Sequence, residues 1–209
     1  MEQALGFAFR WAHVIFGITW IGMLYYFNFV QTEYFKEAEA EGLKDAKAKL
    51  APRALWWFRW GAMFTFITGL YLLHYLKAYA NFTAFGWIWM GALAGTFMFL
   101  NVWLIIWPNQ QIVLGLNGKS GDGPAAAAKA GLASRTNTLF SGPMLLGMFG
   151  TGHSGIAPSA TAVGIVMAII VLLELNALFG KMGPMASVKG VIHCSIALVA
   201  AFWAIFAFV

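Results

Sequence analysis

The chain has 209 residues, of which 61% are hydrophobic and only 10% are charged, and its formal net charge is +5. So few charged side chains cannot cover the surface of a soluble domain, so the composition excludes an ordinary soluble protein and indicates an integral membrane protein. The basic residues gather between apolar segments, which argues against nucleic acid as a partner. We expect one all-α, polytopic membrane helical bundle over residues 1–209, embedded in a lipid bilayer.

Six apolar segments approach the roughly 20 residues that a helix needs to cross a bilayer. They are residues 6–31, 54–76, 84–107, 137–153, 161–180 and 188–209. The fourth contains Gly142 and Pro143, and we expect it to be kinked or partly unwound. Two connections are long. Residues 32–53 are charged and should continue as a helix that stops near Pro52, and residues 108–135 should form a loop followed by a small helix.

The basic residues fall almost entirely on one side of this six-span arrangement. All Lys and Arg residues except Arg10 and Lys77 lie in the first, third and fifth connections or just inside the second span. The positive-inside rule then places connections 32–53 and 108–135 in the cytoplasm and both termini outside. The expected location is the bacterial inner (cytoplasmic) membrane, crossed several times, with the N-terminus outside.

The first span carries its polar residues on one helical face. At 100° per residue, a stripe about 80° wide contains six residues. These are Arg10, His13, Gly17, Trp20, Asn28 and Gln31. The second span has a similar stripe, formed by Trp56, Arg59, Met63, Phe66, Leu70 and His74. Gly17 would let a flat group approach the backbone, and Gly91 with Gly95 in the third span would permit close helix packing.

Three of the four histidines are predicted at one level. His13, His74 and His153 come out within roughly 10 Å of the outer boundary at 1.5 Å per residue, whereas His193 is near the inner end of the sixth span. Ionisable residues inside a membrane tend to mark function. The alternative is that each histidine satisfies a backbone carbonyl or sits in the wet interface.

A pair of neutral imidazoles near the outer face, with Arg10 and Lys77 to meet the propionates, suits a haem b. The candidate cofactor-binding residues are His13, His74, His153, Arg10, Gly17 and Trp20, with the three histidines as candidate metal ligands. The second axial ligand stays open between His74, His153 and none. Zinc and copper are disfavoured, because no carboxylate or thiolate lies at that depth. The single cysteine, Cys194, excludes the two-cysteine attachment motif of a c-type haem.

A second polar set lies in the cytoplasmic half of the spans. Its members are Asn28, Gln31, Arg59, Asn101, Glu174 and His193. These residues either form a structural cluster that fixes helix register or line a pocket for a polar or quinone-like substrate.

Four strings carry a family resemblance. "RWAHVIFGITWIG", "LWWFRWGAMFTFITG", "GALAGTFMFLNVWLIIWPNQQ" and "SRTNTLFSGPMLLGMFGTGHS" resemble, in order, the membrane domain of the bacterial membrane-bound urate oxidases (urate hydroxylases). The resemblance covers the chain to about residue 155 and is weak in the last two spans. It fits a short form without the c-type cytochrome that often follows this domain. The first string is also similar to the first helix of the haem-binding protoporphyrinogen oxidase family, which implies His13 as a haem ligand. His153 matches a histidine at the end of a family helix.

These features predict a haem b-binding membrane protein that takes part in electron transfer or oxidation and is related to membrane urate oxidases. It would be an oxidoreductase or an electron-transfer subunit, with a cytochrome c or an oxidase as its partner at the outer face. The alternative is a non-catalytic membrane subunit of a larger respiratory or photosynthetic complex, or a homo-oligomer. A transporter is disfavoured, because the spans show no internal repeat.

Overall fold

The computed structural model describes all 209 residues, and every regular element in it is helical. Six long helices make the bundle: α1 (Glu2–Tyr25), α4 (Ala51–Tyr75), α5 (Gly86–Leu100), α7 (Gly123–His153), α8 (Ala160–Phe179) and α9 (Val188–Phe208). Three short helices extend them: α2 (Thr32–Glu37), α3 (Ala40–Asp45) and α6 (Trp107–Leu114). The predicted all-α bundle of six helices is confirmed. Residues 2–37, 86–114, 160–179 and 188–208 are long and apolar enough to cross a membrane.

The first long connection breaks at a different place from the one expected. The backbone turns extended at Ala38 and Glu39 and is helical again from Ala40 through α4, so the predicted stop near Pro52 is wrong. Pro52 lies in the first turn of α4, directly after a π-helical turn at Ala46–Leu50. A proline lacks the backbone N–H and crowds the carbonyl four residues earlier, and the wider π turn relieves that conflict.

The fourth span is part of a much longer helix than expected. α7 begins at Gly123, where Asp122 accepts a hydrogen bond from the N–H of Ala125 at 3.0 Å and caps the helix. The small helix predicted within residues 108–135 is therefore the first half of α7.

The predicted unwinding at Gly142-Pro143 is not found, since α7 continues through Pro143. Pro143 cannot donate to the carbonyl of Leu139 four residues earlier. The Ser195 hydroxyl on α9 donates to that carbonyl instead, at 2.9 Å. A neighbouring helix thus satisfies the group that the proline leaves free.

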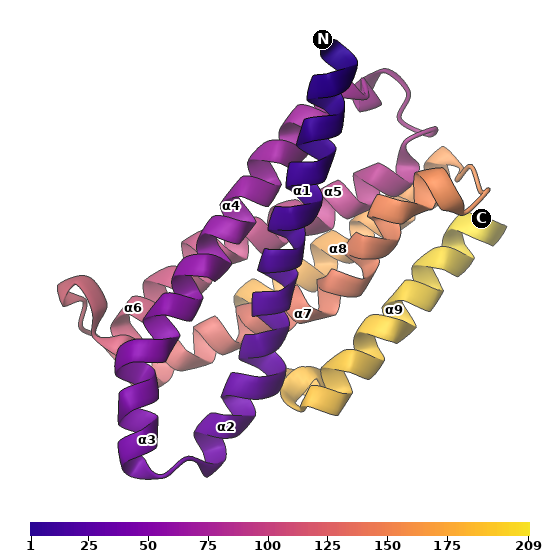
Figure 1. Cartoon of the computed structure of the whole chain (residues 1–209). Helices are drawn as coiled ribbons and strands as arrows, with labels where there is room; N and C mark the ends of the chain where they lie inside the picture. Colours follow the sequence, from indigo (N-terminus) through magenta and orange to yellow (C-terminus); the bar gives the residue numbers. More distant parts are fainter.

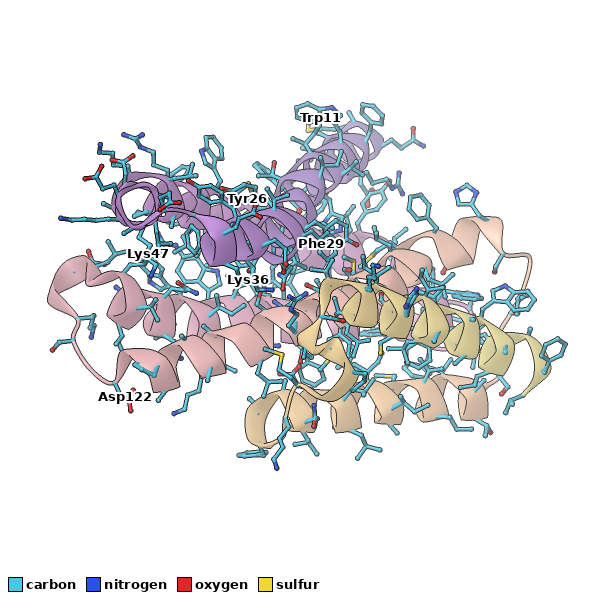
Figure 2. The ribbon with its side chains drawn as sticks, turned by 90° about the horizontal axis from the view of Figure 1, so that it is seen from below. Trp11, Tyr26, Phe29, Lys36, Lys47 and Asp122 are labelled. Carbon is cyan, nitrogen blue, oxygen red and sulfur yellow. The ribbon has the colours of Figure 1, made fainter.

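The helices form three layers. α1 packs along α4, α5 packs along α7, and α8 and α9 cover the opposite side of the α5–α7 pair. Figure 2 shows the same order, with the purple α1–α4 layer on one side, the pink layer in the middle and the orange and yellow helices on the other side. Both chain ends lie at the end of the bundle away from the α2–α3 turn (Figure 1). The α1–α4 pair touches the middle layer less extensively than α5 touches α7.

The closest helix contact lies between α5 and α7. A Cβ placed on Gly147 would lie 2.7 Å from both the Cα of Gly91 and the carbonyl oxygen of Trp87. The predicted packing role of Gly91 is thereby confirmed, since the two backbones touch there. Gly95 is different, because a Cβ there would come no closer than 3.8 Å to Met144.

Candidate functional site

A cavity of about 350 Å³ lies between the α1–α4 pair and helices α5 and α7. It is of the size of small-molecule and cofactor sites, and its walls are mainly Leu, Ile, Val, Phe and Met side chains. Along α1 it reaches from Arg10 to Trp20, which is about 15 Å of helix. The looser packing between the first and second layers leaves this space, which we call the outer cavity.

His13 lies on the wall of the outer cavity in a fixed orientation. Its Nδ1 is 2.9 Å from the carbonyl oxygen of Thr65 and 3.0 Å from the hydroxyl oxygen of Thr68. A carbonyl only accepts hydrogen bonds, so Nδ1 carries a proton, and in the neutral ring Nε2 then keeps its lone pair. A Cβ on Gly69 would lie 3.1 Å from the His13 ring, so a glycine lets the imidazole lie against α4. A metal-ligating histidine usually donates its other ring N–H to a backbone carbonyl or a similar acceptor in this way.

Two other predicted cofactor residues line the same cavity. Trp20 is 2% exposed, and its indole Nε1 is buried without a hydrogen-bond partner. Arg10 is exposed at the outer end of the cavity, with its guanidinium 5.3 Å from the centre of the Tyr75 ring. A cation at the mouth and an unpartnered donor at the inner end are groups that an anionic cofactor edge or a polar ligand atom could satisfy.

The structure does not bring His74, His153 and Gly17 to the outer cavity. His74 and His153 are exposed, with their rings against Tyr79 and Phe149 respectively. No group of three His, Cys, Asp or Glu side chains in the chain could hold a metal ion, so the three histidines share no metal site.

The second predicted stripe is also not the buried face of α4. Trp56, Leu70 and His74 are exposed, and the residues that pack inward are smaller on average. They include Ala54, Leu55, Phe58, Gly61, Ala62, Thr65 and Thr68. Helix α1 comes close to this face, because a Cβ on Gly61 would lie 3.1 Å from the backbone nitrogen of Trp20.

The outer cavity also holds two methionines that the sequence analysis missed. Met144 and Met148, one turn apart on α7, line the wall that α7 contributes. Apart from His13, they are the only side chains on the wall that can ligate haem iron, which accepts His and Met as axial ligands. Their spacing of four residues beside glycines in "GPMLLGMFGTG" is the sequence signal that would have identified them.

The predicted inner polar residues separate into four places. Asn28 and Gln31 line a second cavity beside α2 and α7, which we call the inner cavity. Arg59 lies over the Trp107 ring, 3.3 Å from its centre. Asn101 and Glu174 meet in the protein interior, and His193 is exposed on α9. The structure therefore does not gather the six residues into one pocket.

Asn101, Asn137 and Glu174 form a closed hydrogen-bond network. Asn101 Nδ2 donates to Glu174 Oε2 at 3.1 Å and to Asn137 Oδ1 at 3.0 Å, and Asn137 Nδ2 donates to the carbonyl of Met98 at 2.9 Å. All three side chains are buried. The network joins α7 and α8 to the turn between α5 and α6, where Asn101 lies. This arrangement fits the predicted alternative of a structural cluster that fixes helix register.

We expect Glu174→Ala to lower the free energy of unfolding by about 1–3 kcal/mol, because it leaves a buried amide donor without its acceptor. Glu174→Gln keeps an oxygen acceptor and should stay close to the wild type. Thermal unfolding of both variants in the same detergent measures the difference. Equal melting temperatures for the alanine and glutamine variants would contradict a role for this hydrogen bond in stability.

A family model described as urate oxidase N-terminal matches residues 74–207. The match covers more than half of the chain, and the protein belongs to this urate oxidase N-terminal family, which relates it to the membrane urate oxidases. No curated protein matches the chain. No solved structure matches it either.

The extent of the family match differs from the predicted resemblance. It runs through α8 and α9, where the resemblance was expected to be weak, and it leaves out residues 1–73. His13, Arg10 and Trp20 lie outside the matched residues, so the part they play rests on the geometry of the outer cavity. Met144 and Met148 lie inside the match.

Proposed function

We propose that this protein binds haem b in the outer cavity and takes part in electron transfer or oxidation in a membrane. The observation that carries the proposal is the His13 imidazole, whose Nδ1 is held by Thr65 and Thr68 and whose Nε2 is free on a mainly apolar wall. A neutral imidazole fixed in this tautomer is the form that ligates haem iron. Membership of the urate oxidase N-terminal family supports an oxidative role.

The residues of the cavity have separate parts in this proposal. His13 would ligate the haem iron, and Met144 or Met148 on α7 is the candidate for a second protein ligand. Arg10 at the mouth would pair with a propionate, and Trp20 Nε1 offers a hydrogen bond at the inner end. The apolar walls exclude water. Bound haem would supply one-electron chemistry, and its potential would depend on the axial ligands and this burial.

We further propose that all six long helices span the bacterial inner membrane, with both termini outside. The even number of antiparallel passes, both chain ends at one end of the bundle and the basic residues around the opposite end support this topology. Large apolar side chains are exposed around the bundle, among them Trp11, which points outward in Figure 2, and Trp57, Phe149 and Trp203. A lipid bilayer would cover them.

Cysteine labelling of intact cells and inverted vesicles tests the topology. In a Cys194→Ser background, a cysteine at Glu39 between α2 and α3 should react with an impermeant maleimide only in inverted vesicles. A cysteine at Asn81, between α4 and α5, should react only in intact cells. The six-span topology places one crossing, α4, between these two positions, so they should lie on opposite sides. Reaction of both cysteines from the same side would contradict it.

Absorption of the detergent-purified protein, oxidised and then reduced with dithionite, tests the haem proposal. A Soret band and sharpened b-type bands on reduction are expected. Under this topology the outer cavity faces the side where a cytochrome c or an oxidase would accept electrons. A colourless protein, expressed with an adequate haem supply, would overturn the proposal in favour of a non-catalytic membrane subunit.

A further inference from the structure

The inner cavity is a second candidate binding site, separate from the proposed haem site. It has a volume of about 310 Å³ and shares no lining residue with the outer cavity. Its walls come from α2 and the turn that joins it to α1, from α4, α6 and the first half of α7, and from the turn before α9. In the proposed topology it lies at the cytoplasmic end of the bundle.

Arg135 on α7 is a buried cation without a counter-ion in this cavity. It is 5% exposed, it forms no salt bridge, and its Nη1 is buried without a hydrogen-bond partner. Arginine stays protonated in proteins, and a buried charge is costly unless it is paired. A negatively charged group bound in the cavity would therefore stabilise this side chain.

No acidic residue of the protein forms a salt bridge with Arg135. Glu33 is the acidic side chain close enough to act on Arg135, and its carboxylate binds Lys36 at 2.7 Å instead. Taken together, Arg135, Lys36 and Glu33 leave one positive charge around the cavity.

Other groups in the cavity suit a polar ligand. Gln31 Oε1 is buried without a hydrogen-bond partner, so a second polar group is also unsatisfied. Lys36 lines the cavity from α2 (Figure 2), and Gln110 lines it from α6. Asn28 is held in place, because its Nδ2 donates to the carbonyl of Leu24 and to the Ser134 hydroxyl.

We propose that the inner cavity binds a small oxyanion, carried either by a cytoplasmic solute or by the head group of an anionic lipid. The planar guanidinium of Arg135 forms two parallel hydrogen bonds to the oxyanion. Lys36, whose charge is balanced by Glu33, offers ammonium N–H donors at the rim, and the Gln31 amide bonds a hydroxyl or a further oxygen of the ligand. Nothing in this assignment depends on haem.

Isothermal titration calorimetry of the purified, delipidated protein in a neutral detergent tests the assignment, with ionic strength held constant. The probes are inorganic phosphate for a solute and dihexanoylphosphatidylglycerol for a lipid, with dihexanoylphosphatidylcholine as the zwitterionic control. Arg135→Gln should weaken binding about tenfold or more, because it removes a charge-assisted pair of hydrogen bonds. Lys129→Gln is the matched control, since it removes the same charge from an exposed position on the same helix.

Binding of phosphate that Arg135→Gln loses and Lys129→Gln keeps supports a solute. Binding of the phosphatidylglycerol alone, lost in the same variant, supports a lipid. No binding of either probe, or equal binding by both variants, overturns the assignment. If Arg135→Gln does not fold, Lys36→Gln replaces it, because this side chain is 62% exposed and not needed for packing. An affinity of Lys36→Gln equal to that of Lys129→Gln then overturns the assignment.

Discussion

His13→Ala is expected to abolish the haem absorbance of the purified protein while leaving the helical fold intact. The haem-to-protein ratio should fall about tenfold or more, since changes around a metal ligand alone cost about 10–100-fold in affinity. The reason is the fixed imidazole, which contacts Thr65 and Thr68 through Nδ1 and leaves only Nε2 for iron. The measurement is the reduced-minus-oxidised spectrum, with circular dichroism to verify the fold.

The other histidines provide matched controls. His74→Ala and His153→Ala remove the same ring from exposed positions outside the outer cavity, and both should keep the Soret band. Met144→Leu and Met148→Leu then identify the opposite ligand, because exchange of an axial ligand moves the reduced bands and the potential. A His13→Ala protein with the full wild-type band would contradict the proposed ligation. Loss of the band in His153→Ala but not in His13→Ala would show instead that the haem site lies at the end of α7.

Gly147→Ala is expected to have the largest effect on stability. Its new methyl group would lie 2.7 Å from the Cα of Gly91 and from the carbonyl oxygen of Trp87, both of them backbone atoms. Helices α5 and α7 would have to separate, and overpacking of this kind costs about 1–3 kcal/mol. The expected result is a clearly lower midpoint of thermal unfolding in detergent than that of the wild type.

Gly164→Ala is the control for helix propensity. Gly164 lies within α8, and a Cβ there would meet nothing within 4 Å. Alanine favours a helix by up to about 1 kcal/mol over glycine, so this variant should be as stable as the wild type or slightly more stable. If Gly147→Ala matched Gly164→Ala in stability, the close α5–α7 contact would be contradicted.

The six long helices could be predicted from the sequence because their signal is local. A long apolar segment favours a helix, because a helix pairs every backbone N–H and C=O within the segment, so the six apolar segments predict six helices. The family could also be predicted, because it depends on the order of short strings. The break at Ala38 and Glu39 and the passage of α7 through Pro143 could not be predicted. A distant hydroxyl, that of Ser195, satisfies the carbonyl that Pro143 leaves free, and no local pattern contains that contact.

For the candidate site, the sequence by itself determined the polar face of α1, and with it His13 and Trp20 on the wall of one cavity. Helical phase is enough for that, since both residues lie on one helix. Only the tertiary structure decided that Met144 and Met148 face the same cavity while His74 and His153 do not, and that Arg135 is buried without a counter-ion. The physical reason is that depth along a helix fixes the level of a side chain, whereas its neighbours depend on how each helix is rotated about its own axis against the others.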